Sequence, residues 1–478
     1  MTNRPSVFRA LFLVALTLCP AACVWAQTFT TLATFDLKNG ADPYNGALAQ
    51  GTDGNYYGTT MGGGIHGRGV FFRVTPSGAL TDIYNFCSVT KCADGEGPWS
   101  NPVLGTDGNF YGTTNLGGNS ESAGTIYQIT PEGKLTTLYS FCPASPCNDG
   151  KYPMSLMQAS NGNFYGVATN YGVGNNGTIF AISRSGVFKV LYSFCTQPNC
   201  ADGSEPSSGL MQASNGNLYG TTFKGGIYNG GESGIVYEVS PAGQFRTIHN
   251  FCAETHCTDG SNPDAALVQD AKGNLYGTTF YGGTNAVGTV FEITATGKFI
   301  VLHSFDNTDG ADPSAAMTIA NDGNLYGMTY ESSTFQGTIF QISAKGEFNS
   351  LFNFCSQTAC VDENPYGALF QATDGIFYGT TIEGGPSNDG TIFSFSTGLQ
   401  PLVETVPTAA KVGARVIILG NNLTGSTAVS FNGTAASFTV VSNTAITAIV
   451  PAGATTGKIT VTTTTGTLSS NPAFQVLP

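Results

Sequence analysis

A short motif that recurs seven times constrains this chain more than any other feature. The motif is Asp-Gly-Asn or Asn-Gly-Asn, then an aromatic residue or Leu, then Tyr-Gly, with one departure each in the fifth and seventh copies. Its tyrosines are Tyr57, Tyr111, Tyr165, Tyr219, Tyr276, Tyr326 and Tyr378, spaced by 50 to 57 residues. Self-similarity at such a period indicates a repeat protein in which neighbouring units pack on one another.

Every repeat carries four short apolar segments, rich in β-branched and aromatic residues and bounded by turn residues, which predict four strands. In the fourth repeat these segments are Gly209–Gln212, Leu218–Thr222, Ile235–Val239 and Phe245–Phe251. Asn215-Gly216 predicts a tight hairpin, and the other connections alternate between short turns and longer loops. Four antiparallel strands repeated seven times predict an all-β, seven-bladed β-propeller over residues 27–398.

The phase of the repeats predicts how such a ring closes. Residues 29–35 match the fourth strand of a repeat, whereas the last repeat stops after its third strand, 391–395. Pairing these two segments would complete one sheet from both ends of the chain and leave no open edges between them.

The N-terminus predicts export. Arg4 and Arg9 precede an apolar run and small residues that end at Ala26, which is the layout of a cleaved signal peptide over residues 1–26. An alternative makes Cys23 a lipid-anchored residue, although Pro20 disfavours it. No later apolar run reaches the roughly 20 residues that a membrane-spanning helix needs. We therefore expect a secreted or cell-surface protein with no transmembrane segment in its mature chain.

The remaining cysteines support the same location. All ten fall into pairs separated by four residues: Cys87/Cys92, Cys142/Cys147, Cys195/Cys200, Cys252/Cys257 and Cys355/Cys360. One pair per repeat does not assemble the four ligands of a metal site, so we predict five local disulfides and no metal or cofactor. Each disulfide accompanies the longer version of its loop and contributes about 2 kcal/mol in the chain-entropy description.

Composition excludes one large class of partner. The chain carries 18 Lys and Arg against 31 Asp and Glu, a net charge of −13. A protein without a cationic surface does not neutralise a phosphate backbone, so we expect no nucleic acid partner.

The chain changes character after Pro401. Residues 401–478 contain no cysteine and are rich in Thr, Val and Ala, with alternating segments such as 415–419, 428–431 and 458–462. About 75 residues of short strands predict a small Ig-like β-sandwich after the repeats.

Two families are recognisable at this point. Residues 28–398 resemble the secreted bacterial GloVer repeat proteins, through Asp-Gly-Asn-x-Tyr-Gly-Thr-Thr, Gly-Gly and Gly-Thr-[Ile/Val] signatures in the repeats. Residues 401–478 resemble an IPT/TIG domain, through Gly413, 419–423, 429–433 and 450–453. The first resemblance implies an exported or surface protein without an established activity, and the second implies a spacer or interaction module.

Catalytic patterns are scarce in the sequence. It contains no Gly-x-Ser-x-Gly, no His-Glu-x-x-His and no P-loop. A metal hydrolase of the propeller type needs several acidic ligands near the axis, but Asp264 is the sole acid beside the segments predicted to be innermost. The repeated Asp-Gly elements admit two interpretations, calcium ligands or structural turns, and turns are favoured because each loop offers only one carboxylate.

Aromatic residues mark the candidate binding site. Tyr44, Trp99, Tyr152 and Tyr366 are predicted at the inner lip of the face that carries the long loops. They are suited either to stacking on a sugar or peptide or to plugging the channel mouth. We therefore predict a monomeric, non-catalytic extracellular binding or structural protein with a glycan or protein ligand. The alternatives are a propeller-type lyase or lactone hydrolase and a purely structural envelope protein.

Overall fold

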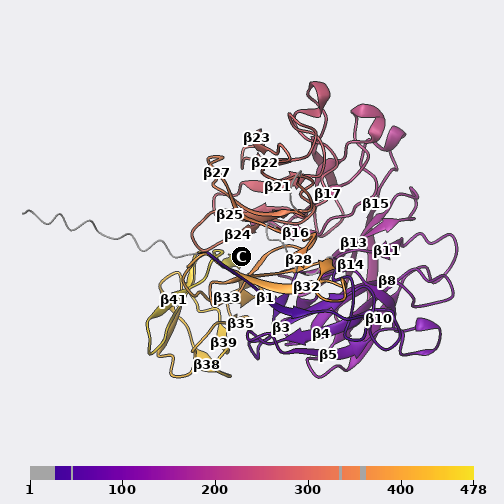
Figure 1. The fold of residues 1–478 in the computed structure, drawn as a ribbon. Coiled ribbons are helices and arrows are strands. Elements are labelled where there is room, and N and C mark those ends of the chain that lie inside the picture. Colours follow the sequence, from indigo (N-terminus) through magenta and orange to yellow (C-terminus); the bar gives the residue numbers. More distant parts are fainter. Residues whose placement is uncertain (1–26, 45–46, 333–335, 356–361, 478) are drawn as a thin grey trace, which may run out of the picture.

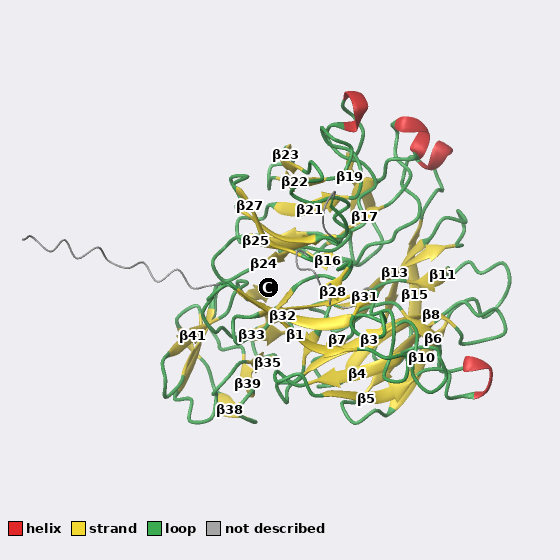
Figure 2. Cartoon of the chain, viewed as in Figure 1, coloured by secondary structure: helices red, strands yellow, loops and turns green. Residues whose placement is uncertain are grey.

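The computed structural model describes residues 27–477 except 45–46, 333–335 and 356–361. The predicted signal peptide and Cys23 lie outside the described residues. Within them the protein is all-β (Figures 1 and 2), and the helical elements are short 3-10 turns in loops. These turns are η1 (Thr90–Cys92), η2 (Pro198–Cys200), η3 (Asn229–Gly231) and η4 (Thr255–Cys257). No helix in this part of the chain is long and apolar enough to cross a membrane.

The described residues of the repeats form seven antiparallel sheets, each with a path of four strands. Sheet 1 contains β2 (Ala49–Gln50), β3 (Tyr56–Thr60), β4 (Val70–Val74) and β5 (Leu80–Asn85). Sheet 2 contains β7 (Val103–Leu104), β8 (Phe110–Leu116), β9 (Thr125–Ile129), β10 (Leu135–Ser140) and the additional β6 (Glu96–Pro98). Sheet 3 contains β12 (Met157–Gln158), β13 (Phe164–Asn170), β14 (Thr178–Ile182), β15 (Phe188–Ser193) and the additional β11 (Lys151–Pro153).

The later repeats follow the same order. Sheet 4 contains β16 (Met211–Gln212), β17 (Leu218–Thr222), β18 (Ile235–Val239) and β19 (Phe245–Asn250). Sheet 5 contains β20 (Val268–Gln269), β21 (Leu275–Thr279), β22 (Thr289–Ile293) and β23 (Phe299–Ser304). Sheet 6 contains β24 (Thr318–Ile319), β25 (Leu325–Thr329), β26 (Thr338–Ile342) and β27 (Phe348–Asn353). Sheet 7 contains β29 (Phe370–Gln371), β30 (Phe377–Thr381), β32 (Thr391–Ser396) and β1 (Thr28–Thr34), with β28 (Asp362–Glu363) and β31 (Glu383–Gly384) as a separate ribbon.

Sheet 7 joins the two ends of the repeat region. Strand β1 pairs antiparallel with β32, with Phe29 opposite Phe395, and Figure 1 shows the indigo β1 beside the orange β32. The Phe29 ring also stacks on Phe352 of sheet 6, with 4.2 Å between ring centroids. This is the pairing that the phase of the repeats predicts.

A glycine and a proline form the same contact between successive sheets. The glycine precedes the third strand of one sheet and lies against the Cδ atom of a proline that leads into the next sheet. A Cβ atom added to each glycine would lie 2.4 to 2.8 Å from that proline atom. The pairs are Gly69–Pro98, Gly124–Pro153, Gly177–Pro206, Gly234–Pro263, Gly288–Pro313, Gly337–Pro365 and Gly390–Pro43. The last pair joins sheet 7 to sheet 1.

Glutamines at the ends of five first strands make a second link between sheets. Each Oε1 atom accepts a backbone N–H from the first turn of the preceding sheet, at 2.8 to 3.1 Å. The glutamines are Gln50, Gln158, Gln212, Gln269 and Gln371. Gln50 receives its bond from Thr373 of sheet 7, so this link also connects the last sheet to the first.

The motif tyrosines pack between neighbouring sheets. Tyr57 lies 4.3 Å from Phe110 of sheet 2 by ring centroids, and its hydroxyl donates to Asp53 in its own hairpin turn at 2.9 Å. Tyr326 repeats the arrangement with Phe377 and Asp322. Each tyrosine therefore holds both a turn and an inter-sheet contact.

The C-terminal region forms two four-stranded sheets around one apolar core that includes Val416, Ile446 and Val461. One sheet contains β33 (Glu404–Val406), β35 (Arg415–Leu419), β39 (Ala445–Ile449) and β38 (Phe438–Val440). The other contains β37 (Thr434–Ala435), β36 (Ala428–Phe431), β40 (Ile459–Thr462) and β41 (Thr467–Ser469), while β34 (Ala409–Lys411) pairs in parallel with β42 (Gln475–Leu477).

The C-terminal region contacts the first turns of the repeats. The Thr444 hydroxyl donates to the Thr52 carbonyl at 2.7 Å, and Asn421 Nδ2 donates to Thr373 Oγ1 at 2.9 Å. Leu419 also belongs to the apolar cluster that contains Tyr57. The two regions therefore share both polar and apolar contacts.

Candidate binding site at the cavity between the sheets

We call the seven prolines of the glycine–proline contacts between sheets the joint prolines. The residues that follow them form one set of equivalent positions. In the order of the sheets they are Tyr44, Trp99, Met154, Ser207, Asp264, Ser314 and Tyr366. The prolines place them where the chain turns from a loop into the first strand of a sheet. Met154, Ser207, Asp264, Ser314 and Tyr366 line a single cavity of about 270 Å³.

The first strands and the residues before them supply the rest of the lining. Val103, Leu156, Leu210 and Ala266 lie on this cavity, although they come from four different sheets. Four of the segments that the sequence predicts as innermost therefore contribute to the lining of one cavity. Most of its walls are made of Ala, Ser and aliphatic side chains.

Three of the four predicted aromatic residues come together. The Tyr44 ring lies 4.7 Å from Trp99 and 4.3 Å from Tyr366 by ring centroids, and Tyr330 contacts Tyr366 at 5.5 Å. We call Tyr44, Trp99 and Tyr366 the aromatic side of the site. Of the three, Tyr366 lines the cavity, and the Tyr44 ring contacts both Tyr366 and Trp99.

Tyr152 has a different position. It precedes Pro153 instead of following it, its φ is 61°, and its backbone N–H donates to the Ala123 carbonyl of sheet 2 at 3.0 Å. Its equivalents are the residues before the other joint prolines, which share this left-handed conformation, such as Glu205 and Asp312. The structure therefore separates Tyr152 from the aromatic side.

Three consecutive sheets supply the polar side of the site, formed by Ser207, Asp264 and Ser314. The Tyr366 hydroxyl donates to Asp264 Oδ2 at 3.4 Å, so a contact connects the two sides. Burial raises the pKa of Asp264 to about 6, against the opposing effect of the neighbouring Ser207 and Tyr366 hydroxyls.

Two hydroxyls on the cavity wall lack a partner. The Oγ atoms of Ser155 and Ser314 are buried and make no hydrogen bond to any described residue. Ser314 is only 6% exposed. Buried hydroxyls normally find a protein or water partner, so rotation of either side chain toward the cavity would let it bond to an occupant.

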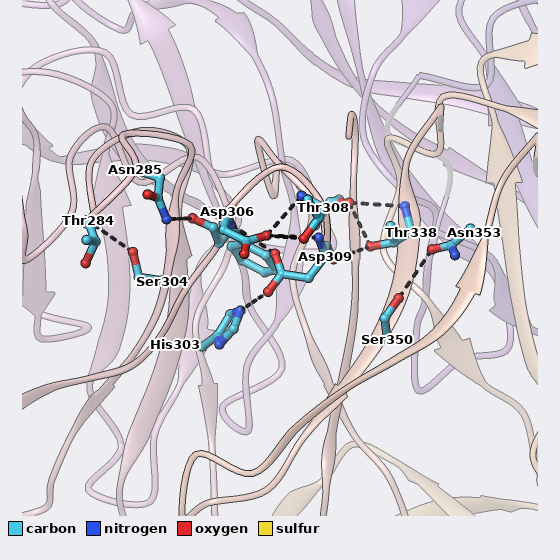
Figure 3. Close-up of polar contacts among 12 residues, drawn as sticks. Thr284, Asn285, His303, Ser304, Asp306, Thr308, Asp309, Thr338, Ser350 and Asn353 are labelled. Atoms are coloured by element: carbon cyan, nitrogen blue, oxygen red, sulfur yellow. Dashed lines mark hydrogen bonds and ion pairs between the residues drawn. The ribbon is translucent and has the colours of Figure 1, made fainter. Parts of the chain in front are cut away.

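The Asp-Gly loops lie elsewhere and hold themselves together. Asp202 is fully buried and accepts hydrogen bonds from the Tyr192 hydroxyl at 2.7 Å and from the Thr196 backbone and hydroxyl at 3.0 and 2.8 Å. In the loop without cysteines, His303 Nε2 lies 2.8 Å from Asp309 Oδ2 (Figure 3). These carboxylates are occupied within their own loops, which favours the interpretation as structural turns.

Four of the five predicted disulfides are present: Cys87–Cys92, Cys142–Cys147, Cys195–Cys200 and Cys252–Cys257. Cys360, and with it the fifth pair, lies outside the described residues. Four disulfides indicate an oxidising, extracellular environment.

Sequence reasoning named Tyr44, Trp99 and Tyr366, whose rings the structure brings together, but it missed the set of equivalent positions to which they belong. Aligning the repeats on their joint prolines would have found it, because the seven positions follow Pro43, Pro98, Pro153, Pro206, Pro263, Pro313 and Pro365. That alignment would also have excluded Tyr152. The unpartnered serine hydroxyls carry no sequence signal that distinguishes them from other serines.

The fold and the cavity together define an all-β repeat protein, built from four-stranded sheets whose first strands converge on a partly polar cavity. The Gloeobacter/Verrucomicrobia repeat profile matches residues 22–233 and 231–441. The chain belongs to this repeat family, and the resemblance stated from the sequence is confirmed for the repeats. No curated protein matches the chain.

The comparison with solved structures finds several similar chains. One is the extracellular domain assigned to a hybrid two-component system of B. thetaiotaomicron, with a TM-score of 0.51 and 10% identity over 83% of this chain and 46% of that one. The present chain thus spans less than half of that neighbour. A protein assigned to the gluconolactonases has a TM-score of 0.38 and 12% identity, over 64% of this chain and 90% of that one. A Bacteroides thetaiotaomicron protein of unknown function has a TM-score of 0.40 and 13% identity, over 78% and 76% of the two chains.

Proposed function

We propose that this protein is an exported, monomeric binding protein of the cell surface or medium, without catalytic activity, whose ligand is a glycan or a protein. The observation that carries the proposal is the site formed by the residues after the joint prolines. Tyr366 and the polar side face one cavity there, and binding sites typically combine an apolar surface with a few placed polar groups.

The architecture we propose around this site is a seven-bladed β-propeller closed by β1, followed by an IPT/TIG Ig-like domain over residues 401–478. The Gly390–Pro43 contact and the Gln50 link between sheets 7 and 1 support the closure. In this arrangement the Gly-Gly loops and the loops with disulfides share one face, and the site opens toward that long-loop face. Loops held on a rigid scaffold are common places for recognition.

A propeller-type lyase or lactone hydrolase is the second candidate. Such an enzyme needs several carboxylate or amide ligands around a central ion or a pair of titratable groups. Among the described residues that line the cavity, Asp264 is the single carboxylate. We therefore rank the enzyme below the binding protein, and a purely structural envelope protein third.

A glycan array and a screen of extracellular proteins test the binding function, using wild type, Tyr366→Ala and the control Tyr281→Ala. Tyr281 is 46% exposed and lies outside the site, so its removal should leave binding unchanged. We expect Tyr366→Ala to weaken binding at least tenfold, because Tyr366 lines the cavity. Metal-dependent turnover in a lyase and lactonase screen, without any ligand on the array, would overturn the proposal.

A further inference from the structure

We propose that the cavity holds one neutral sugar unit, with its ring against Tyr366 and its hydroxyls bonded to Asp264 and the serines. The inference rests on the proposed binding function and names the ligand class for the same site. A single sugar unit here means a free monosaccharide or the terminal unit of a glycan.

The first argument is the asymmetry of seven equivalent positions. The motif tyrosine, which packs between sheets, is the same residue in all seven repeats. The residues after the joint prolines instead differ between repeats, and residues of similar chemistry come from consecutive sheets. Ser207, Asp264 and Ser314 come from sheets 4 to 6, whereas Tyr366, Tyr44 and Trp99 come from sheets 7, 1 and 2. Packing alone gives no reason for one aromatic and one polar block among equivalent positions.

The second argument is the set of polar atoms. Asp264 accepts hydrogen bonds, while the unpartnered hydroxyls of Ser155 and Ser314 can donate or accept. A ligand with several hydroxyls satisfies all three groups at once. Among the described residues on the cavity wall there is no Lys, Arg or His, so the site offers no counter-charge to an anion.

The third argument is the form of the aromatic side. A cage for a quaternary ammonium group surrounds the cation with separate ring faces. Here the Tyr44 ring lies within 4.7 Å of both Trp99 and Tyr366, which leaves no space between the rings for a cation. Tyr366 alone of these rings lines the cavity, and a single aromatic ring suits the less polar face of a flat ligand.

The size of the cavity agrees with one sugar ring. A cavity of about 150 Å³ holds benzene, which has six heavy atoms. By that proportion the 270 Å³ observed here would hold roughly eleven heavy atoms, close to the twelve of a hexose. A disaccharide would extend beyond the cavity toward solvent.

The experiment is saturation-transfer NMR and calorimetry with methyl glycosides of neutral hexoses, 6-deoxyhexoses and N-acetylhexosamines, with choline and a uronate as comparison probes. We expect at least one neutral glycoside to bind and the uronate to bind at least tenfold more weakly. Asp264→Asn should weaken binding about tenfold, because the amide replaces one of the two acceptor oxygens with a donor. Ser314→Leu should abolish binding by filling the cavity.

Controls separate loss of the site from loss of the fold. Ser185→Leu places the same side chain on an exposed turn and should bind as wild type. Asp264→Asn should melt at or above the wild-type temperature, since it removes a buried charge, so its weaker binding would not come from unfolding. Ser314→Leu is interpreted only if its melting temperature stays within a few degrees of wild type.

Three outcomes overturn the inference. Choline binding without any sugar would replace it with a cation site. Glycan binding that survives both Ser314→Leu and Asp264→Asn would place the glycan elsewhere, while the proposed function stands. A wild-type protein that binds neither the glycosides nor any array glycan or protein would contradict the inference and the proposed function together.

Discussion

The contact between Gly177 and Pro206 offers a direct test of how the sheets are joined. Gly177 has a φ of +101°, and a Cβ atom there would lie 2.4 Å from Pro206 Cδ and 2.7 Å from the carbonyl oxygens of Ala168 and Thr169. Two of these atoms are backbone, and the third belongs to a proline ring, so none of them can rotate away. Gly177→Ala must therefore move the backbone of one sheet relative to the next.

The expected cost has two parts. An L residue in a left-handed conformation costs about 1–2 kcal/mol. Forcing an extra methyl group into a close-packed site costs about 1–3 kcal/mol more. The sum is about 2–5 kcal/mol. With an unfolding entropy of roughly 2.1 cal/mol/K per residue, a mature chain of about 450 residues would melt about 2–5 °C lower.

The matched control is Gly162→Ala in the first hairpin turn of the same sheet. Gly162 has a φ of +83°, but a Cβ atom there has no neighbour within 4 Å. Gly162→Ala should lower the free energy of unfolding only by the cost of an L residue in the left-handed conformation, about 1–2 kcal/mol. Both variants are compared by calorimetry and chemical denaturation. Equal losses for the two glycines would refute the argument that close approach to proline requires glycine at the joints.

Four further predictions concern ring closure, the loops and the site. Gly390→Ala should cost as much as Gly177→Ala, because a Cβ atom would lie 2.7 Å from Pro43 Cδ; a loss no larger than that of Gly162→Ala would argue against a joint between sheets 7 and 1. Phe29→Ala should lower the free energy of unfolding by about 2–4 kcal/mol through loss of its stacking on Phe352, whereas Leu37→Ala, at a side chain that is 60% exposed, should stay within about 0.5 kcal/mol of wild type. Tyr192→Phe removes one donor from buried Asp202 and should cost about 1 kcal/mol in denaturant titrations, while Tyr228→Phe, at a residue 40% exposed, should cost nothing measurable. The pKa of Asp264 is about 6 in the folded protein and about 4 when unfolded, so the folded state binds the extra proton and Asp264 contributes stability as the pH falls from 6 to 4. Asp264→Asn should remove that part of the pH dependence, of order 2–3 kcal/mol, and a difference between the two proteins that is flat with pH would contradict the raised pKa.

The sequence predicted the strands well where the repeat is strict. The third strand of the fourth repeat was expected at Ile235–Val239 and lies there, because its apolar residues are buried on both sides. The first strand was expected at Gly209–Gln212 but pairs only over Met211–Gln212. The residues before it leave the sheet and line the cavity, with the Ser208 hydroxyl bonded to Thr221 at 2.7 Å.

Sequence reasoning named aromatic residues of the candidate site but not its serines. Period and spacing report what the repeats share, whereas Tyr44, Trp99 and Tyr366 were singled out as large aromatic residues at the predicted inner lip of the long-loop face. Tyr152 is as conspicuous, but one position in register changes the direction of a side chain. Serine is a common residue type, and Ser314 is recognisable as a candidate site residue only because its hydroxyl is buried without a hydrogen-bond partner. The chemistry of this cavity thus depends on where the repeats differ, and those differences become interpretable once the strictly repeated residues, such as Gly177 and Pro206, have fixed the register in space.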